Sequence, residues 1–126
     1  MIRVAGLVIL FLAAGIPMAK ADFSQEIRYC VSDDMHPDIR IVACTRNIQS
    51  GRFIGSNLAV AFNNRGLAYA ELSDYDRAIE NCSAAISLEP GDPDYYDTRG
   101  KAYKKQGDGK RAEADFATAR KLMSAQ

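Results

Sequence analysis

The residues best suited to chemistry in this chain are its three cysteines and its single histidine. Cys30, His36 and Cys44 lie close together in the sequence, and with a neighbouring aspartate they could offer thiolate, imidazole and carboxylate ligands to a metal ion. Zinc sites, however, usually combine two closely spaced ligand pairs, and Cys-x13-Cys with one histidine is not such a pattern. A thiol nucleophile activated by His36 would need a reduced cysteine and a third group to orient the imidazole. We therefore predict no metal site and no thiol catalysis, and expect His36 to cap a helix or to face water.

The rest of the sequence contains no other pattern typical of catalysis. It has no glycine-rich phosphate loop, no Cys-x-x-Cys pair and no Cys-x-x-Cys-His haem attachment. Asp74 and Asp92 resemble carboxylates at helix starts, which the helix dipole favours. Sixteen Lys+Arg balance sixteen Asp+Glu, so the chain carries no basic footprint for nucleic acid. We predict a protein that is not an enzyme, needs no cofactor and binds no nucleic acid, with a small secreted enzyme as a remote alternative.

Residues 1–21 differ from the rest and have the order of a secretory signal peptide. Arg3 supplies a positive start, Val4–Ile16 is an apolar run shorter than the ~20 residues that span a bilayer, and Ala19-Lys20-Ala21 fits a cleavage site. We expect cleavage before Asp22, export to the periplasm or secretion, and no stable membrane insertion afterwards. The alternative is an uncleaved anchor.

The elements that must position any site come from an internal repeat, because residues 59–92 align with residues 93–126. The repeat predicts two helices in each unit. We expect helices from Ser56, as N-cap, to about 72, from 75 to about 89, from 93 to about 106 and from 110 to about 124. Gly66 should meet Ala85, and Gly100 should meet Ala119, where two antiparallel helices cross. The identical pairs are Arg65/Arg99, Gly66/Gly100, Ala68/Ala102, Tyr69/Tyr103, Asp74/Asp108, Arg77/Arg111, Ala78/Ala112, Ala85/Ala119 and Leu88/Leu122.

These units resemble the tetratricopeptide repeat (TPR) family, whose pattern is W-x2-L-G-x2-Y, then A-x3-F, then P. Arg65 and Arg99 replace the leucine of the pattern, Cys82 replaces its phenylalanine, and Ser124 stands where the second proline would be. The resemblance implies an all-α fold in which antiparallel helix pairs stack as a short solenoid. The matching residues are Phe62, Gly66, Tyr69, Ala78, Ala85 and Pro90 in the first unit and Tyr96, Gly100, Tyr103, Ala112, Phe116 and Ala119 in the second.

Residues 22–58 are predicted to form a degenerate helix pair, at about 23–31 and 37–49. When Cys44 is aligned with Cys82, the series Ile41, Cys44 and Ile48 reproduces the spacing of Ile79, Cys82 and Ile86. Cys30 would lie on the partner helix of Cys44, and an oxidising compartment favours a disulfide. Three cysteines allow three pairings. We favour Cys30–Cys44 and expect Cys82 to be a buried thiol.

The resemblance also implies a concave groove, lined by the first helix of each unit, that binds a peptide segment or another protein. Residues 22–92 are acidic overall and residues 93–126 basic, which indicates either a bipolar docking surface or an ordinary solvated one. The groove residues implied are Val60, Asn63, Leu67, Ala70 and Glu71 in the first unit and Asp94, Asp97, Lys101, Lys104 and Lys105 in the second. The three lysines could equally form a solvated helix face.

The C-terminal edge offers an alternative role in self-association. The last helix is expected to pack on its partner through Ala112, Phe116, Ala119 and Met123, leaving an apolar edge around Leu122. A modest edge of this kind predicts a monomer that self-associates only weakly.

Overall fold

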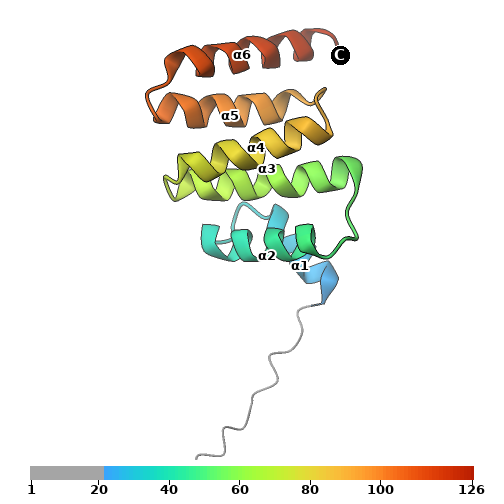
Figure 1. Cartoon of the computed structure of the whole chain (residues 1–126). Coiled ribbons are helices and arrows are strands. Elements are labelled where there is room, and N and C mark those ends of the chain that lie inside the picture. The colour runs from blue at the N-terminus through green and yellow to red at the C-terminus, as the bar shows by residue number, and fades with distance from the viewer. Residues whose placement is uncertain (1–21) are drawn as a thin grey trace, which may run out of the picture.

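The computed structural model describes residues 22–126, so the predicted signal peptide at 1–21 lies outside the described residues. Within residues 22–126 every regular element is an α-helix, and consecutive helices stack in chain order from α1 at one end to α6 at the other (Figure 1). The all-α prediction is therefore confirmed. The helices are α1 (Phe23–Val31), α2 (Pro37–Gln49), α3 (Gly55–Glu71), α4 (Tyr75–Leu88), α5 (Pro93–Lys105) and α6 (Gly109–Ser124).

Aspartate side chains cap the starts of three helices, of which Asp74 and Asp92 were expected there and Asp108 was not. Asp74, Asp92 and Asp108 accept hydrogen bonds from backbone N–H groups of the first turns of α4, α5 and α6, at 3.2, 2.9 and 3.1 Å. Such caps satisfy backbone donors that have no partner inside the helix. His36 caps α2, where its Nδ1 accepts from the Asp38 N–H at 3.4 Å. His36 and the three aspartates thus act as helix caps.

The start of α3 differs from the prediction. The helix begins at Gly55 after Ile54, whose side chain makes no capping hydrogen bond. Ser56 lies inside the first turn, and its hydroxyl donates to Glu89 Oε1 at 3.1 Å. Ser56 is therefore not the N-cap. Its hydroxyl instead links the start of α3 to the end of α4.

Gly66 and Gly100 lie at close approaches between the helices of a pair, but their partners differ from those predicted. A Cβ at Gly66 would lie 3.0 Å from Cys82 Sγ, and one at Gly100 would lie 2.7 Å from the Phe116 ring. The nearest atoms thus come from a point one turn before Ala85 and Ala119. Ala85 instead packs with Ala59 and Tyr95, between consecutive pairs. The predicted contact was wrong in register, although both glycines are needed where α3 meets α4 and α5 meets α6.

A disulfide joins the two helices of the N-terminal pair. Cys30 on α1 and Cys44 on α2 are bonded, with their Cα atoms 4.7 Å apart, as predicted. Both cysteines are buried in a cluster with Ala43 and Ala61, which couples the pair to α3. Cys82 is a buried free thiol, as expected, and burial raises its pKa to about 12. Burial thus favours the neutral thiol, which packs between α3 and α4.

The last helix packs partly as predicted. Ala112 and Ala119 are buried against α5 and Phe116 is half-buried, but Met123 is 55% exposed. The prediction for Met123 was therefore wrong. Its spacing continues the buried stripe, but at the last turn of α6 the side chain is more than half exposed, beside Asp94 at the start of α5.

Candidate binding groove

Side chains from three successive helices line a shallow hollow of about 260 Å³. The last turns of α3 and α5 form its two sides, and the first residue of α4 closes one end. Its surface is mostly apolar, with charged side chains on the rim. The lining residues are Leu67, Ala70, Glu71, Tyr75, Thr98, Lys101, Ala102 and Lys105.

The hollow brings together half of the predicted groove residues. Ala70 and two repeat-equivalent pairs, Leu67/Lys101 and Glu71/Lys105, lie around it. Each pair is one repeat length apart, so stacking two units places the same helix position on opposite sides. The geometry of the repeat therefore creates this surface.

The other predicted groove residues lie elsewhere. Val60 lines a separate small hollow with Phe53 and side chains of α1. Asn63 is buried, with its Oδ1 accepting from the Cys82 thiol at 3.7 Å, so it faces α4 and not the groove. Asp94 lies at the start of α5 beside Met123.

Two further predicted residues lie near the groove without lining the hollow. Asp97 does not line the hollow, but its carboxylate forms an ion pair at 2.5 Å with Lys101, which does. Lys104 is exposed in the last turn of α5. The predicted groove residues that line the hollow thus lie in the C-terminal halves of α3 and α5.

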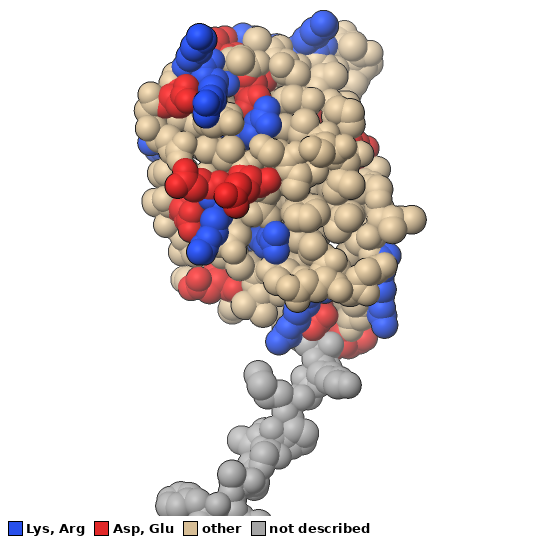
Figure 2. Space-filling view, in the orientation of Figure 1, with Lys and Arg blue, Asp and Glu red and all other residues tan. Residues whose placement is uncertain are grey.

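Charges of both signs meet at this end of the groove. Glu71 forms an ion pair with Arg40 of α2, whose side chain is only 2% exposed. Among residues 22–126, Lys105 makes no ion pair, so its ammonium is available to a ligand. Figure 2 shows charged side chains gathered on the left of the view, the side on which Figure 1 places the turns after α3 and α5. A ligand in the hollow would therefore meet an apolar floor beside an acidic and a basic rim.

A layer of arginines was missed as a structural feature, although both residues were visible as departures from the repeat pattern. Arg99 donates to both carboxylate oxygens of Asp115, at 2.8 and 2.7 Å, and to Ser83 Oγ at 3.1 Å. The Asp115 hydrogen bond raises the pKa of Arg99. The signal that could have revealed the layer is the recurrence of arginine at the same position of both repeats.

Arg65 makes the equivalent contacts one unit earlier. It donates to Asn81 Oδ1 at 2.7 Å and to Thr45 Oγ1 at 3.2 Å. Burial lowers the pKa of Arg65, whose partner in its own pair is an amide and not a carboxylate. Each arginine thus joins its own pair to the preceding one, and together they fix the spacing of the helices that line the groove.

Within residues 22–126 no group of three or more His, Cys, Asp or Glu side chains could hold a metal ion. The same part of the chain contains no helix both long and apolar enough to cross a membrane.

Comparison with protein families and solved structures points to one architecture. The tetratricopeptide repeat family model matches residues 59–92. No curated protein sequence matches the chain. A crystal structure of MamA superimposes with a TM-score of 0.65 at 23% identity, over 83% of this chain and 60% of that one. A second, titled "Crystal structure of MamA protein", gives a TM-score of 0.63 at 23% identity, over 82% and 56%.

At this identity the likeness to MamA concerns the fold, and the chain spans about 60% of the length of the MamA chains it matches. The family model covers one unit, which contains α4 and most of α3. The unit at 93–126 repeats that architecture in α5 and α6. Residues 59–92 are thus a tetratricopeptide repeat, and the described helices have the stacked helix-pair fold of that family.

Proposed function

We propose that the chain is an exported, non-enzymatic interaction module that holds a peptide segment of another protein in the groove between α3 and α5. The observation that carries the proposal is the meeting of repeat-equivalent side chains, Leu67/Lys101 and Glu71/Lys105, around one apolar hollow. The sequence of residues 1–21 supports export to the periplasm or cell envelope. Tetratricopeptide repeats generally bind protein partners, which supports the same role.

The size and chemistry of the hollow define what it can hold. About 260 Å³ accommodates one or two apolar side chains of an extended segment and leaves the rest of the ligand on the rim. Lys105 can pair with a carboxylate of the ligand, and the apolar floor contributes burial at about 25 cal/mol per Å². Binding of this kind is weak to moderate, because the buried area is small.

Photocrosslinking in cells tests the proposal. A crosslinking residue at position 70, on the groove floor, should capture a discrete protein partner, whereas the same residue at Glu80, exposed on α4, should not. Adding Lys105→Glu should reduce the capture at position 70 at least about tenfold if the rim charge contributes. Equal capture from both positions would refute a groove-specific partner.

Location needs its own measurement. Intact mass of the protein from the cell envelope should show a chain that begins at Asp22. A full-length mass would contradict cleavage, and recovery from the cytoplasm alone would contradict export.

A further inference from the structure

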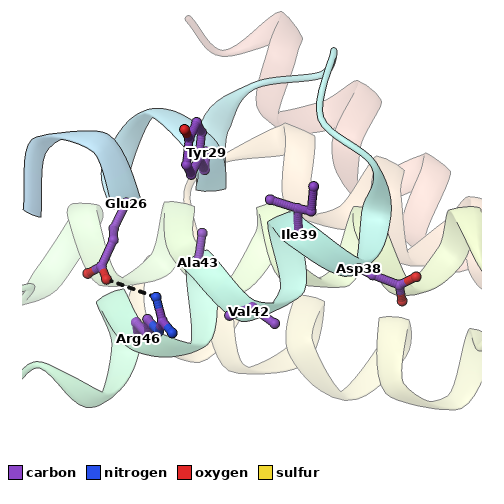
Figure 3. A pocket seen from close by; sticks show the side chains of 7 residues that line it. All are labelled: Glu26, Tyr29, Asp38, Ile39, Val42, Ala43 and Arg46. Carbon is purple, nitrogen blue, oxygen red and sulfur yellow. Dashed lines mark hydrogen bonds and ion pairs between the residues drawn. The ribbon is translucent and has the colours of Figure 1, made fainter. Parts of the chain in front are cut away.

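A second apolar hollow, of about 340 Å³, lies on the N-terminal helix pair and shares no lining residue with the groove. Figure 3 shows its side chains, with Glu26 and Tyr29 projecting from α1 and the others from α2. The disulfide holds the two helices together, so both sides of the hollow are fixed. The lining residues are Glu26, Tyr29, Asp38, Ile39, Val42, Ala43 and Arg46.

The exposed apolar side chains on α2 contrast with the equivalent positions on α4. In the alignment that matches Cys44 with Cys82, Ile39 corresponds to Arg77 and Val42 to Glu80. Arg77 and Glu80 are charged and lie on the solvated side of α4. Ile39 and Val42 are 46% and 51% exposed, so α2 presents apolar surface where α4 presents charge. A partner on this face would remove that surface from water.

The charges on the same stripe indicate what the partner is. Asp38 lies four residues before Val42 and Arg46 four residues after it, so all three occupy one face of α2. If a second α2 packs antiparallel with the two Val42 side chains at the centre, Asp38 of each copy lies beside Arg46 of the other. Both charge pairs are then formed by one twofold axis, and the face is complementary to itself.

We propose that two copies of this chain associate back to back through α2, with Val42 at the twofold axis and Asp38 of each copy paired with Arg46 of the other. This contact goes beyond the proposed peptide groove, which it leaves open on both copies. One short helix from each copy makes a small interface, under the ~1,200 Å² typical of stable complexes, so the dimer is a weak one. Arg46 already contacts Glu26 at 3.3 Å, which holds its guanidinium on this face before association.

Sedimentation over a range of concentrations tests the apolar centre of the contact. Residues 22–126, which contain all six described helices, should be compared with the full chain. Val42→Glu should raise the dimer dissociation constant at least about tenfold, because it places two carboxylates at the axis. Leu72→Glu, at a side chain 43% exposed on another part of the chain, is the matched control and should leave association unchanged.

Charge exchange tests the antiparallel geometry. Asp38→Arg alone should weaken association because it sets arginine against Arg46, and Arg46→Asp alone should weaken it because it sets two aspartates together. A mixture of these two single variants should form a heterodimer more readily than either variant pairs with itself. In the heterodimer one copy carries arginine at positions 38 and 46 and the other carries aspartate at both, so each of the two contacts joins an arginine to an aspartate. In either homodimer both contacts join like charges. Circular dichroism of each variant establishes that α2 still folds.

Three results would overturn the proposal. The first is a wild-type chain that stays monomeric at the highest concentrations reached. The second is a dimer that survives Val42→Glu but is lost in Leu122→Glu, which would place the contact at the C-terminal edge. The third is a pair of single charge variants that associate as well as the wild type although Val42→Glu abolishes the wild-type dimer.

Discussion

The helices of a repeat approach each other at a glycine, whereas the N-terminal pair has no glycine in either helix and is joined by a covalent bond. Gly66 and Gly100 allow α3 and α5 to approach within van der Waals contact of α4 and α6. The pair α1–α2 is linked instead by Cys30 and Cys44. Its first helix is also much shorter, 9 residues against 17 in α3. A short helix buries little apolar surface, so a cross-link stabilises a pair that packing alone would hold weakly.

A second contrast lies in the buried cations. Where the repeats have Ala78 and Ala112, the aligned position of α2 is Arg40, which is buried and paired with Glu71. The repeats instead place their arginines on the first helix, where Arg65 and Arg99 join neighbouring pairs. The comparison shows that the same stacking of helix pairs accommodates buried arginines at different positions, provided that each buried charge has a partner.

We expect the largest loss of stability when the disulfide of the N-terminal pair is removed. Cys30→Ala with Cys44→Ala should lower the free energy of unfolding by about 3 kcal/mol, because the bond closes a loop of about 15 residues in the unfolded chain. Urea denaturation followed by circular dichroism measures the loss, and reductant added to the wild type should reproduce it. A midpoint that neither treatment moves would show that packing alone holds α1 to α2.

The next effect breaks the close approach in the repeats. Gly100→Leu should cost about 2–3 kcal/mol, because even its Cβ would lie 2.7 Å from the Phe116 ring, and Gly66→Leu should be strongly destabilising for the same reason. Gly109→Leu is the matched control, since nothing lies within 4 Å of a Cβ there. Equal melting temperatures for the Gly100 and Gly109 variants would remove the packing argument.

Replacing the arginine of each repeat should lower stability by a smaller amount, and by more in the second repeat than in the first. Arg99→Met should cost about 2 kcal/mol, because it leaves the buried carboxylate of Asp115 without its partner. Arg65→Met should lower the free energy of unfolding by only about 1 kcal/mol, because the partner that it leaves, Asn81, is uncharged. Asn81 also keeps its own hydrogen bond to the Arg77 carbonyl, at 2.8 Å. Chemical denaturation of both variants gives the difference. Adding Asp115→Asn to Arg99→Met should recover part of the loss, and no recovery would contradict the stranded carboxylate.

We expect the smallest change in stability from substitutions in the turn between the two helices of each repeat. Ser73 and Gly107 are one repeat length apart, and both have positive φ, 60° and 85°. A serine in this conformation is strained, so Ser73→Gly should raise the free energy of unfolding by about 1 kcal/mol. Thermal denaturation measures the gain, and Gly107→Ser should show a loss of similar size. A destabilised Ser73→Gly variant would mean that the serine side chain contributes more than its backbone costs.

The helices were predicted to within one or two residues because their ends depend on local chemistry. Asp92 followed by Pro93 is a strong helix start, and Pro90-Gly91 ends the helix before it. The Cys30–Cys44 pairing was predictable for a related reason, since helix spacing placed both cysteines on facing helices. Ser56 shows the limit, because a good capping residue was available but the N-cap is Ile54, two residues earlier.

Of the predicted groove residues, only those in the C-terminal halves of α3 and α5 line the hollow. Leu67, Ala70 and Glu71 line it, but Asn63, one turn before Leu67, turns into the α3–α4 contact. Sequence spacing defines where residues lie along a helix, but not the angle at which that helix crosses its neighbour. The mistaken partners of Gly66 and Gly100 have the same origin, because a small change in crossing angle moves the closest contact by one turn.

The sequence by itself therefore determined the repeat length, most of the helix ends and the positions of the two close-approach glycines, and it favoured one cysteine pairing, because these depend on residue type and local spacing. The tertiary structure decided which side chains meet across helices. It brought Arg99 to Asp115, turned Asn63 inward, left Ile39 and Val42 exposed, and set Leu67 opposite Lys101. The physical reason is that each of these contacts depends on the rotation and crossing angle of whole helices, which packing sets for many residues at once.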